Sequence, residues 1–436
     1  AGIGMVHQHF KLIPVMNAWE NISLGEKGGG NPFIQKQRII EKIEALEARF
    51  GLRIPHKKKI YAMPVSEKQT VEILKVLYRG ASVLVLDEPT AVLTPQETAR
   101  LFGMLRTMKA AGCAIIIITH KLPEVMEISD RVTVLRKGKG VGTVYTKDTS
   151  PQALTELMVG GSISLKIHRE QPLPQERPLL EVRSLSLRDP EGLQILDDLS
   201  FDVFGGEILG IAGIAGSGQK ELCEIITGLG RSDSGSIRFL GENLRGLSPR
   251  AIKQKGIRMS FIPEDRLGMG LAAGMSIIDN ILLNSYDRSK GPLVDRVHGL
   301  AQAETIVKRY GISTPSVRHI VKKLSGGNIQ KVLLGRELEQ EPRLLITAYP
   351  VRGLDIGASY SIYDMINAQK KRGVGILFIG EDLDVLQELC DRIMVIHRGA
   401  LMDIVYPLGT SQGSREVTKE AIGLLMLGHK PEPCCG

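Results

Sequence analysis

The sequence has few aromatic residues, few cysteines and no long apolar run, and each shortage argues against a class of protein. Aromatic residues make up 4% of the 436 positions, which argues against a surface that stacks nucleic-acid bases. The five cysteines show neither a paired framework nor the spacing of zinc ligands, which suits a reducing compartment. No apolar run approaches the roughly eighteen residues of a membrane-spanning helix. We therefore expect any membrane role to be exercised from the cytoplasmic side, through another chain.

The remaining composition is that of a globular protein with two or three domains. Hydrophobic residues make up 43% of the chain and charged residues 24%, enough apolar surface for real cores. The net charge of +8 permits a nucleic-acid or membrane-surface partner. The basic residues are spread along the chain, however, and the densest run, Lys57-Lys58-Lys59, is short. Solvated loop charge explains that run more simply, so we expect no nucleic-acid partner.

Two adjacent carboxylates stand in the segment 83–97, VLVLDEPTAVLTPQE. Four apolar residues at 83–86 predict a buried strand of a parallel sheet, and Pro89 ends it. Asp87 and Glu88 therefore lie at the carboxyl end of the strand, where open α/β sheets bind ligands. There Asp87 could hold Mg²⁺ and Glu88 could polarise an attacking water. The alternative is a strand that happens to end in two solvated acids.

The two halves of the chain repeat each other at an offset near 261 residues. The segment DRVTVLRKG that starts at Asp130 recurs as DRIMVIHRG from Asp391, and Pro89 aligns with Pro350. Such a repeat predicts two homologous domains. We expect the organisation to be a first domain at 1–160, a linker at 161–178, a second domain at 179–408 and a C-terminal tail at 409–436.

The repeat also bears on the opening strands of the first domain. Glu264 of the second half aligns with Gln8 of the first half. The second domain carries a long stretch before Glu264, so we expect the first domain to begin about 80 residues before residue 1. Its opening strands, with their glycine-rich loop, are then missing from this sequence.

A glycine-rich loop follows a short apolar strand in the second half. The loop approximates G-x-x-x-x-G-K-[ST], whose backbone N–H groups cradle phosphates at a helix N-terminus. Lysine and hydroxyl positions of that pattern hold Gln219 and Lys220, and we expect a helix from Glu221. The glycines are Gly213, Gly216 and Gly218.

A second glycine motif, LSGGN, opens a predicted helix that runs to about Glu339. Ser325 is a natural N-cap, and Gly326 and Gly327 lack side chains, so the backbone can approach a ligand closely. The positive end of the helix would then face an anion. An ordinary capped helix needs only the serine, so the paired glycines favour a binding role.

At this point the sequence resembles the ATP-binding subunits of ABC transporters over nearly its whole length. Within that superfamily it is most similar to the fused two-domain subunits of bacterial importers for nucleosides and simple sugars. The amino-acid sequence at 63–75 is more similar to that of nucleoside importers than to that of monosaccharide importers. The motifs that carry the resemblance are HQHF at 7–10, LDEPT at 86–90, ITH at 118–120, PEDR at 263–266, LSGGN at 324–328 and RGLD at 352–355.

The resemblance implies an α/β fold of two tandem P-loop NTPase domains. Each would have a RecA-like core, an antiparallel β subdomain and a helical subdomain that bears the signature motif. The first domain would lack its N-terminal strands and its Walker A loop. In this family two ATP molecules are sandwiched between two domains, and each is bound by the Walker motifs of one domain and the signature of the other.

In one of the two implied ATP sites, every motif residue that this sequence contains is of the type that the resemblance requires. Asp87, helped by Gln8, would hold Mg²⁺, and Glu88 would orient or deprotonate water. His120 would contact the γ-phosphate, and Gln8 would also report closure to the membrane subunit. The second domain would contribute its signature and D-loop residues, namely Ser325, Gly326, Gly327, Asn328 and Asp355.

The other implied site is degenerate. Its phosphate loop would comprise Gly213, Gly216, Gly218, Gln219 and Lys220. Ala348 and Tyr349 stand where Asp and Glu belong, and no aromatic residue between 181 and 195 is available to stack on adenine. Further losses are Glu264 at the Q-loop, Glu381 at the histidine position, and Pro64 and Val65 in the first signature. Because the losses all fall in one site, we expect one competent and one degenerate ATP site. Lys220 and Tyr349 depart even from the pattern usual in the subgroup.

The implied partners are transmembrane permease subunits and, indirectly, an extracytoplasmic solute-binding protein. Residues 13–22 and 271–281 are the expected docking surfaces, on the cytoplasmic face of the membrane. Three alternatives stay open. They are a monosaccharide importer, a truncated module that does not hydrolyse ATP, and a cytosolic tandem ATPase acting on ribosomes or DNA. The short linker and the degraded second site argue against the last of these.

Overall fold

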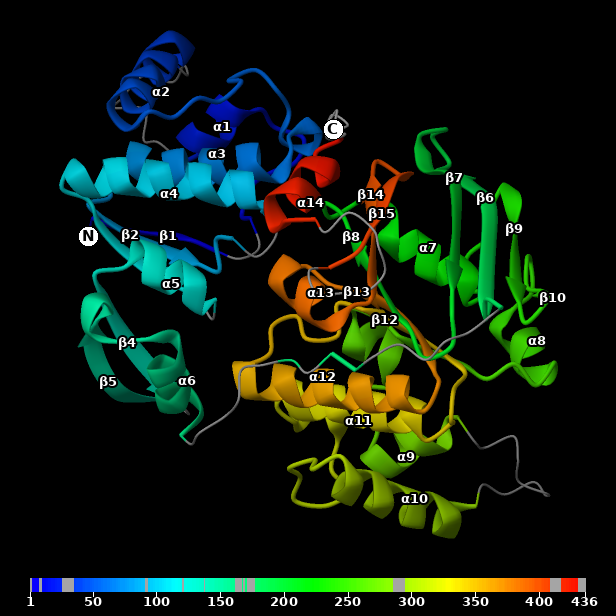
Figure 1. Ribbon diagram of the computed structural model, residues 1–436. Helices are drawn as coiled ribbons and strands as arrows, with labels where there is room; N and C mark the ends of the chain where they lie inside the picture. The colour runs from blue at the N-terminus through cyan, green and yellow to red at the C-terminus, as the bar shows by residue number, and fades with distance from the viewer. Residues whose placement is uncertain are drawn as a thin grey trace, which may run out of the picture. The chain divides into compact units, whose positions relative to one another are not determined.

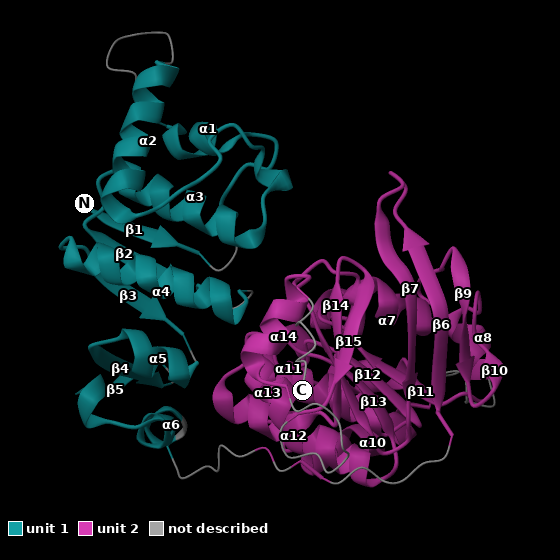
Figure 2. Cartoon of the chain, turned by 45° about the horizontal axis from the view of Figure 1, so that its top comes forward, with its two compact units in different colours: residues 1–163 teal, residues 164–436 magenta. Residues whose placement is uncertain are grey.

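The computed structural model divides into two compact units, residues 1–163 and residues 164–436 (Figure 2). It describes residues 2–7, 10–25, 35–90, 93–119, 121–136, 138–160, 167, 169–170, 177–284, 295–407 and 417–429. Each unit has hydrophobic core residues of its own, so each is described by itself. The domain boundaries at 160 and 179 stay predictions.

Unit 2 is built on a ten-stranded sheet with the order β10-β9-β6-β7-β15-β14-β8-β13-β12-β11 (Figure 1). Five neighbouring strands at one end, from β14 to β11, pair in parallel, and the four strands at the other end, from β10 to β7, pair antiparallel. Between them, β15 pairs in parallel with β7 and antiparallel with β14. The strands are β6 (Leu180–Arg188), β7 (Gln194–Val203), β8 (Ile208–Ala212), β9 (Ser234–Phe239), β10 (Glu242–Asn243), β11 (Met259–Ile262), β12 (Leu344–Ala348), β13 (Gly375–Ile379), β14 (Arg392–His397) and β15 (Ala400–Val405).

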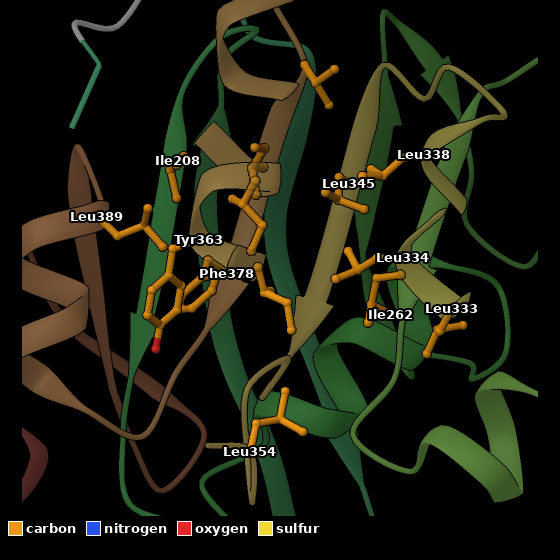
Figure 3. Packing of buried hydrophobic residues seen from close by; sticks show 14 of the residues in the cluster. Ile208, Ile262, Leu333, Leu334, Leu338, Leu345, Leu354, Tyr363, Phe378 and Leu389 are labelled. Carbon is orange, nitrogen blue, oxygen red and sulfur yellow. The ribbon is translucent and has the colours of Figure 1, made fainter. Parts of the chain in front are cut away.

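Both faces of the parallel strands are covered, because successive side chains point to opposite sides of the sheet. Ile376 and Phe378 of β13 belong to one hydrophobic core, and Leu377 and Ile379 belong to the other. In the first core the Phe378 ring meets Tyr363 edge to face, with 6.5 Å between centroids (Figure 3). The helices of unit 2 are α7 (Gln219–Ile226), α8 (Pro249–Gln254), α9 (Ile277–Leu282), α10 (Arg296–Arg309), α11 (Gly326–Leu338), α12 (Ile356–Lys371), α13 (Leu383–Leu389) and α14 (Lys419–Met426).

Unit 1 contains a smaller version of the same parallel sheet. Strands β1 (Ile3–Val6), β2 (Val83–Asp87) and β3 (Ala114–Ile118) pair in that order, and β4 (Arg131–Arg136) and β5 (Lys139–Tyr145) form a separate antiparallel pair. Its helices are α1 (Ala18–Ser23), α2 (Lys36–Phe50), α3 (Val65–Tyr78), α4 (Pro95–Ala110), α5 (Leu122–Ile128) and α6 (Pro151–Val159).

The internal repeat of the sequence is present in the fold. Helix α3 starts at position 65 and α11 at 326, and strand β2 starts at position 83 and β12 at 344. Each pair is 261 positions apart, as are the starts of β3 and β13 and of β4 and β14. The prediction of two tandem domains of one α/β fold is therefore confirmed.

The two copies differ at one edge of the parallel sheet. In unit 2, β13 lies between β12 and β8 and is buried along its length. Within the described part of unit 1, β3 pairs with β2 alone, and its Ile116 and Ile118 side chains are 52% and 48% exposed. The exposure follows because no described strand pairs with the second edge of β3, which leaves that edge and part of the face of the strand uncovered.

The fold of unit 2 also extends into segments predicted as linker and tail. In the segment predicted as linker, Arg169 donates a hydrogen bond to the carbonyl of Cys390, and Glu170 pairs with Lys371 at 2.7 Å. In the segment predicted as tail, helix α14 buries Ile422 and Leu425, which lie three residues apart on one helix face. The structured part of unit 2 therefore does not end at residue 408.

Candidate functional site

The predicted catalytic residues of unit 1 follow three neighbouring parallel strands. Strand β1 ends at Val6, β2 at Asp87 and β3 at Ile118, so these chain segments leave the sheet at the same edge. Gln8 and His120, predicted after β1 and β3, lie outside the described residues. Asp87 and Glu88, at the end of the central strand, are described and are partly buried.

The backbone of Glu88 is held in a sparsely populated conformation. Its φ angle is 44°, in the left-handed region, which costs a non-glycine residue about 1–3 kcal/mol. Its N–H donates a hydrogen bond of 2.8 Å to the carbonyl of Ile118 at the end of β3. Strain of this kind persists only where the surroundings enforce it, and it is enriched at functional sites. The turn thus fixes where the Glu88 side chain leaves the edge of the sheet.

Side chains from two helices support the turn after Glu88. The buried Gln69 of α3 donates from Nε2 to the carbonyl of Pro89 at 2.7 Å. Thr90 donates from Oγ1 to a carboxylate oxygen of Glu124 on α5 at 2.6 Å, and Lys121 donates to the Thr90 carbonyl. These bonds fix both the turn and the segment that enters α5.

The equivalent edge of unit 2 holds an ion-paired cluster in place of hydrolytic groups. Arg352 pairs with Glu264, which follows β11, and its Nε lies 3.6 Å from Glu381, which follows β13. Its guanidinium carbon lies 5.8 Å from the ring centroid of Tyr349. The two carboxylates are thereby committed to an arginine.

Tyr349 repeats the backbone geometry of Glu88 without its chemistry. Its φ angle is 49°, and its N–H donates to the carbonyl of Ile379 at 2.9 Å. Burial, reinforced by the charges of Glu264 and Glu381, raises the pKa of the Tyr349 hydroxyl. The phenol therefore stays neutral and cannot act as a general base, and Ala348 before it offers no ligand for Mg²⁺.

The glycine-rich loop of unit 2 is shaped for close backbone contacts. Gly218 has a φ angle of 93°, and a Cβ there would lie 2.6 Å from the carbonyl oxygen of Ile195. A Cβ at Gly213 would lie 2.7 Å from the carbonyl oxygen of Ile396, and Gly216 has a φ angle of 88°. Two of the three glycines are thus required by the backbone around them.

Gln219 and Lys220, both predicted in the phosphate loop, have different surroundings. The Gln219 side chain is 3% exposed and donates from Nε2 to the carbonyl of Ile214 inside the loop, at 3.2 Å. The Lys220 side chain is 66% exposed and lies 3.8 Å from Glu224. Helix α7 begins at Gln219 rather than at the predicted Glu221. The glutamine amide therefore bonds within the loop, and the lysine faces solvent.

The serine of the signature segment lies at the N-terminus of helix α11, and its hydroxyl makes a side-chain contact that the sequence did not predict. Ser325 occupies the N-cap position of α11 with extended backbone, but its side chain makes no capping hydrogen bond. Its hydroxyl instead accepts a bond of 2.8 Å from Asn328 Nδ2, and Asn328 Oδ1 accepts from the N–H of Ser313. The predicted N-cap position of Ser325 is therefore confirmed, while its hydroxyl bonds Asn328 and makes no capping hydrogen bond.

The residues around the signature also have packing roles. A Cβ at Gly327 would lie 2.9 Å from the Cβ of Ala358, and one at Gly326 would lie 3.3 Å from Leu354 Cδ2. Asp355 caps α12 by accepting a hydrogen bond of 2.9 Å from the N–H of Ala358. Close approach to α12 therefore accounts for Gly327 without a ligand, whereas Gly326 has more room.

Mg²⁺ fits the end of β2 by the chemistry of the residues there. The metal takes oxygen ligands and is commonly held by one or two carboxylates together with substrate phosphates. Asp87 supplies such a carboxylate at the edge of the sheet. Over the described residues there is no cluster of three or more histidine, cysteine, aspartate or glutamate residues that could form an all-protein metal site. No helix in the same residues is long and apolar enough to cross a membrane.

Comparisons with known proteins bear on both units. A family model described as "ABC transporter" matches residues 1–91 and 196–350. The guanosine import ATP-binding protein NupO of Bacillus subtilis is 40% identical, over 98% of this chain and 82% of its own length. The glucose import ATP-binding protein TsgD13 of Haloferax volcanii is 38% identical over the same shares. The nucleoside import ATP-binding protein NupA of Lactococcus lactis is 38% identical, over 98% of this chain and 83% of its own length.

Proposed function

Because this chain belongs to the ABC transporter family, as an ATP-binding protein with two tandem domains, we propose that it hydrolyses ATP to energise the import of a nucleoside. The names of NupO and NupA include guanosine and nucleoside. The amino-acid sequence at residues 63–75 supports the same substrate class. A simple sugar is the second candidate, supported by the similarity to TsgD13.

The proposed hydrolytic machinery uses the carboxylates of unit 1. The observation that carries this assignment is the pair Asp87 and Glu88 at the end of β2, where unit 2 has Ala348 and Tyr349. Asp87, helped by Gln8, would hold Mg²⁺, which when bound neutralises charge on the phosphate oxygens. Glu88 would orient or deprotonate the attacking water.

The remaining assignments complete the proposed machinery. His120 would contact the γ-phosphate. The signature residues Ser325, Gly326, Gly327 and Asn328 and the D-loop residue Asp355 would serve this nucleotide, as the family resemblance implies. Unit 2 would then have a nucleotide loop, formed by Gly213, Gly216, Gly218, Gln219 and Lys220, without hydrolysis.

Permease subunits are the proposed partners, at residues 13–22 and 271–281. Each segment is held by a buried asparagine of its own. Asn21 forms hydrogen bonds with the N–H and the carbonyl of Ile13, and Asn280 does the same with Ala272. Near these turns Val15 is 69% exposed and Met275 is 46% exposed. An apolar tip on a rigid turn suits a docking contact at the cytoplasmic face of the membrane. An extracytoplasmic solute-binding protein would deliver the solute to the permease.

Transport assays test this function. The protein is assembled with the permease subunits encoded beside it in right-side-out membrane vesicles, or in proteoliposomes that enclose the ATP, so that the cytoplasmic side of the transporter meets ATP. Uptake of labelled guanosine and of labelled glucose is then compared with and without ATP. We expect ATP-dependent uptake of guanosine. Uptake of glucose alone would overturn the substrate class, and ATP binding without release of phosphate or uptake of either solute would identify a non-hydrolysing module.

A further inference from the structure

Helix α3 of unit 1 holds the chain two residues before the proposed docking segment, 13–22, with two charged side chains. Glu72 is 4% exposed, and its Oε1 accepts a hydrogen bond of 2.8 Å from the N–H of Lys11. Lys75 donates from Nζ to the carbonyl of Lys11 at 2.7 Å and lies 3.8 Å from Glu72. Both backbone polar atoms of a single residue are therefore bound by side chains three positions apart on one helix.

The contacts of Glu72 and Lys75 with Lys11, called the polar clamp below, require burial of a carboxylate. That burial costs free energy, which argues for a function beyond packing. Burial raises the pKa of Glu72, against the opposing effects of the Lys11 N–H and of the charges of Lys75, His7 and Lys11. A buried carboxylate needs hydrogen-bond and charge partners, and an apolar residue of similar volume often gives a protein of equal or greater stability. Unit 2 supplies that apolar solution at the equivalent position.

At the same place in unit 2 the contact is made by a hydrocarbon side chain. Leu333, 261 positions after Glu72, is fully buried, and a Cβ built on Gly270 would lie 2.8 Å from its Cδ2. Arg336, the counterpart of Lys75, pairs with its neighbour Glu337 at 2.8 Å. The polar clamp is therefore particular to the unit that keeps the carboxylates Asp87 and Glu88.

A second anchor of α3 shows the same difference between the units. Gln69, one turn before Glu72, bonds the carbonyl of Pro89, the residue after Glu88. Its counterpart in unit 2 is Gln330, whose buried side-chain amide has no hydrogen-bond partner among the described residues. Helix α3 is thus joined at one point to Lys11, just before the docking segment, and at another to the turn that positions Glu88. Helix α11 makes neither bond.

We propose that α3 couples permease docking to ATP hydrolysis in unit 1, with Glu72, Lys75 and Gln69 as positioning residues. This inference rests on the proposed import function. A displacement of the docking segment moves the adjoining Lys11, and this movement is passed through Glu72 and Lys75 to the helix and through Gln69 to the turn that fixes Glu88. Chains of packed elements and hydrogen bonds carry coupling in this way when both ends act on the same element.

The test measures how strongly the permease and its solute stimulate ATP turnover. Glu72→Leu installs the residue of unit 2, Glu72→Gln keeps an acceptor for the Lys11 N–H, and Arg106→Leu removes an exposed ion pair elsewhere in unit 1 as the control. We expect Glu72→Leu to lower the stimulation about tenfold with the KM for ATP unchanged. Glu72→Gln should retain most of the stimulation, and Arg106→Leu should match the wild type.

A double-mutant comparison separates coupling from a structural role. Gln69→Met breaks the second anchor, and the variant carrying both Glu72→Leu and Gln69→Met should be no worse than the poorer single variant, because both changes interrupt one linkage. Additive losses would overturn the proposal, as would equal losses of basal and stimulated turnover without rescue by glutamine. If the wild-type assembly itself turns over no ATP, the import function fails instead.

Discussion

Replacing Glu88 with glutamine is expected to abolish ATP turnover and to leave ATP bound. Glutamine keeps the size of the side chain but cannot take a proton from water, and loss of a general base slows catalysis about 10²–10⁴-fold. Since Asp87 and the backbone turn remain, the nucleotide is held and not hydrolysed. Release of phosphate by the assembled transporter and retention of labelled ATP after rapid gel filtration measure the two effects.

Tyr349→Phe is the matched control for that substitution. Tyr349 has the same left-handed backbone and the same N–H bond to the adjacent strand as Glu88. Its substitution therefore tests the effect of a side-chain change at the equivalent turn of unit 2. Because burial keeps the Tyr349 phenol neutral and it takes no part in proton transfer, turnover should stay at the level of the wild type. Turnover above a tenth of normal in Glu88→Gln, or a comparable fall in Tyr349→Phe, would contradict the assignment of hydrolysis to unit 1.

A buried ion pair gives the second large effect, and the internal repeat supplies its control. Lys370 and Asp391 are 1% and 6% exposed and lie 2.7 Å apart. Lys109 and Asp130, each 261 positions earlier, form the same pair at 2.6 Å with exposures of 54% and 73%. The Lys370 ammonium also donates to the carbonyl of Glu170, so the opening segment of unit 2 helps to cover the pair.

We expect Lys370→Met to lower the free energy of unfolding of unit 2 by about 3–5 kcal/mol, because it leaves Asp391 buried without its cation. Burial already raises the pKa of Asp391, against the hydrogen bonds from Ile208 and Lys370. Lys109→Met, at the exposed pair, should change the stability of unit 1 by no more than about 1 kcal/mol.

Two probes report the units separately in this experiment. The single tryptophan, Trp19, lies in unit 1, so its fluorescence follows unfolding of that unit in urea. Hydrogen exchange of the amides in β8 and β13 follows unit 2. Adding Asp391→Asn to Lys370→Met should recover part of the loss, since the unpaired charge is then removed. Equal effects of Lys370→Met and Lys109→Met would show that the buried pair has no special weight.

The sequence predicts the architecture well because the information is repeated within it. The apolar run before Asp87, the offset of 261 positions and the motif order together define two α/β domains, and strands β2 and β12 lie at equivalent positions. The end of β2 is also predictable, because Pro89 follows the acidic pair directly. The left-handed turn at Glu88 could have been suspected only by analogy, since glutamate has no preference for it.

The details that depend on distant contacts could not be predicted. Whether Gln219 meets a phosphate or bonds Ile214 depends on a side-chain rotamer. Ser325 is the N-cap residue, as predicted, but the sequence does not show that its hydroxyl bonds Asn328 rather than a backbone N–H of the first turn. The different burial of the two Lys–Asp pairs depends on a segment far away in the chain, which the local sequence around position 370 does not show.

Counting the phosphate formed in a single turnover tests most directly whether one unit alone hydrolyses ATP. The assembled transporter is loaded with γ-labelled ATP without Mg²⁺, and equilibrium binding gives the number of labelled ATP molecules per chain. Mg²⁺ and excess unlabelled ATP are then added together, and the labelled phosphate released per chain is measured. We predict one labelled phosphate per chain at most, and none from Glu88→Gln. Two labelled phosphates per chain, or one from Glu88→Gln, would contradict hydrolysis by unit 1 alone.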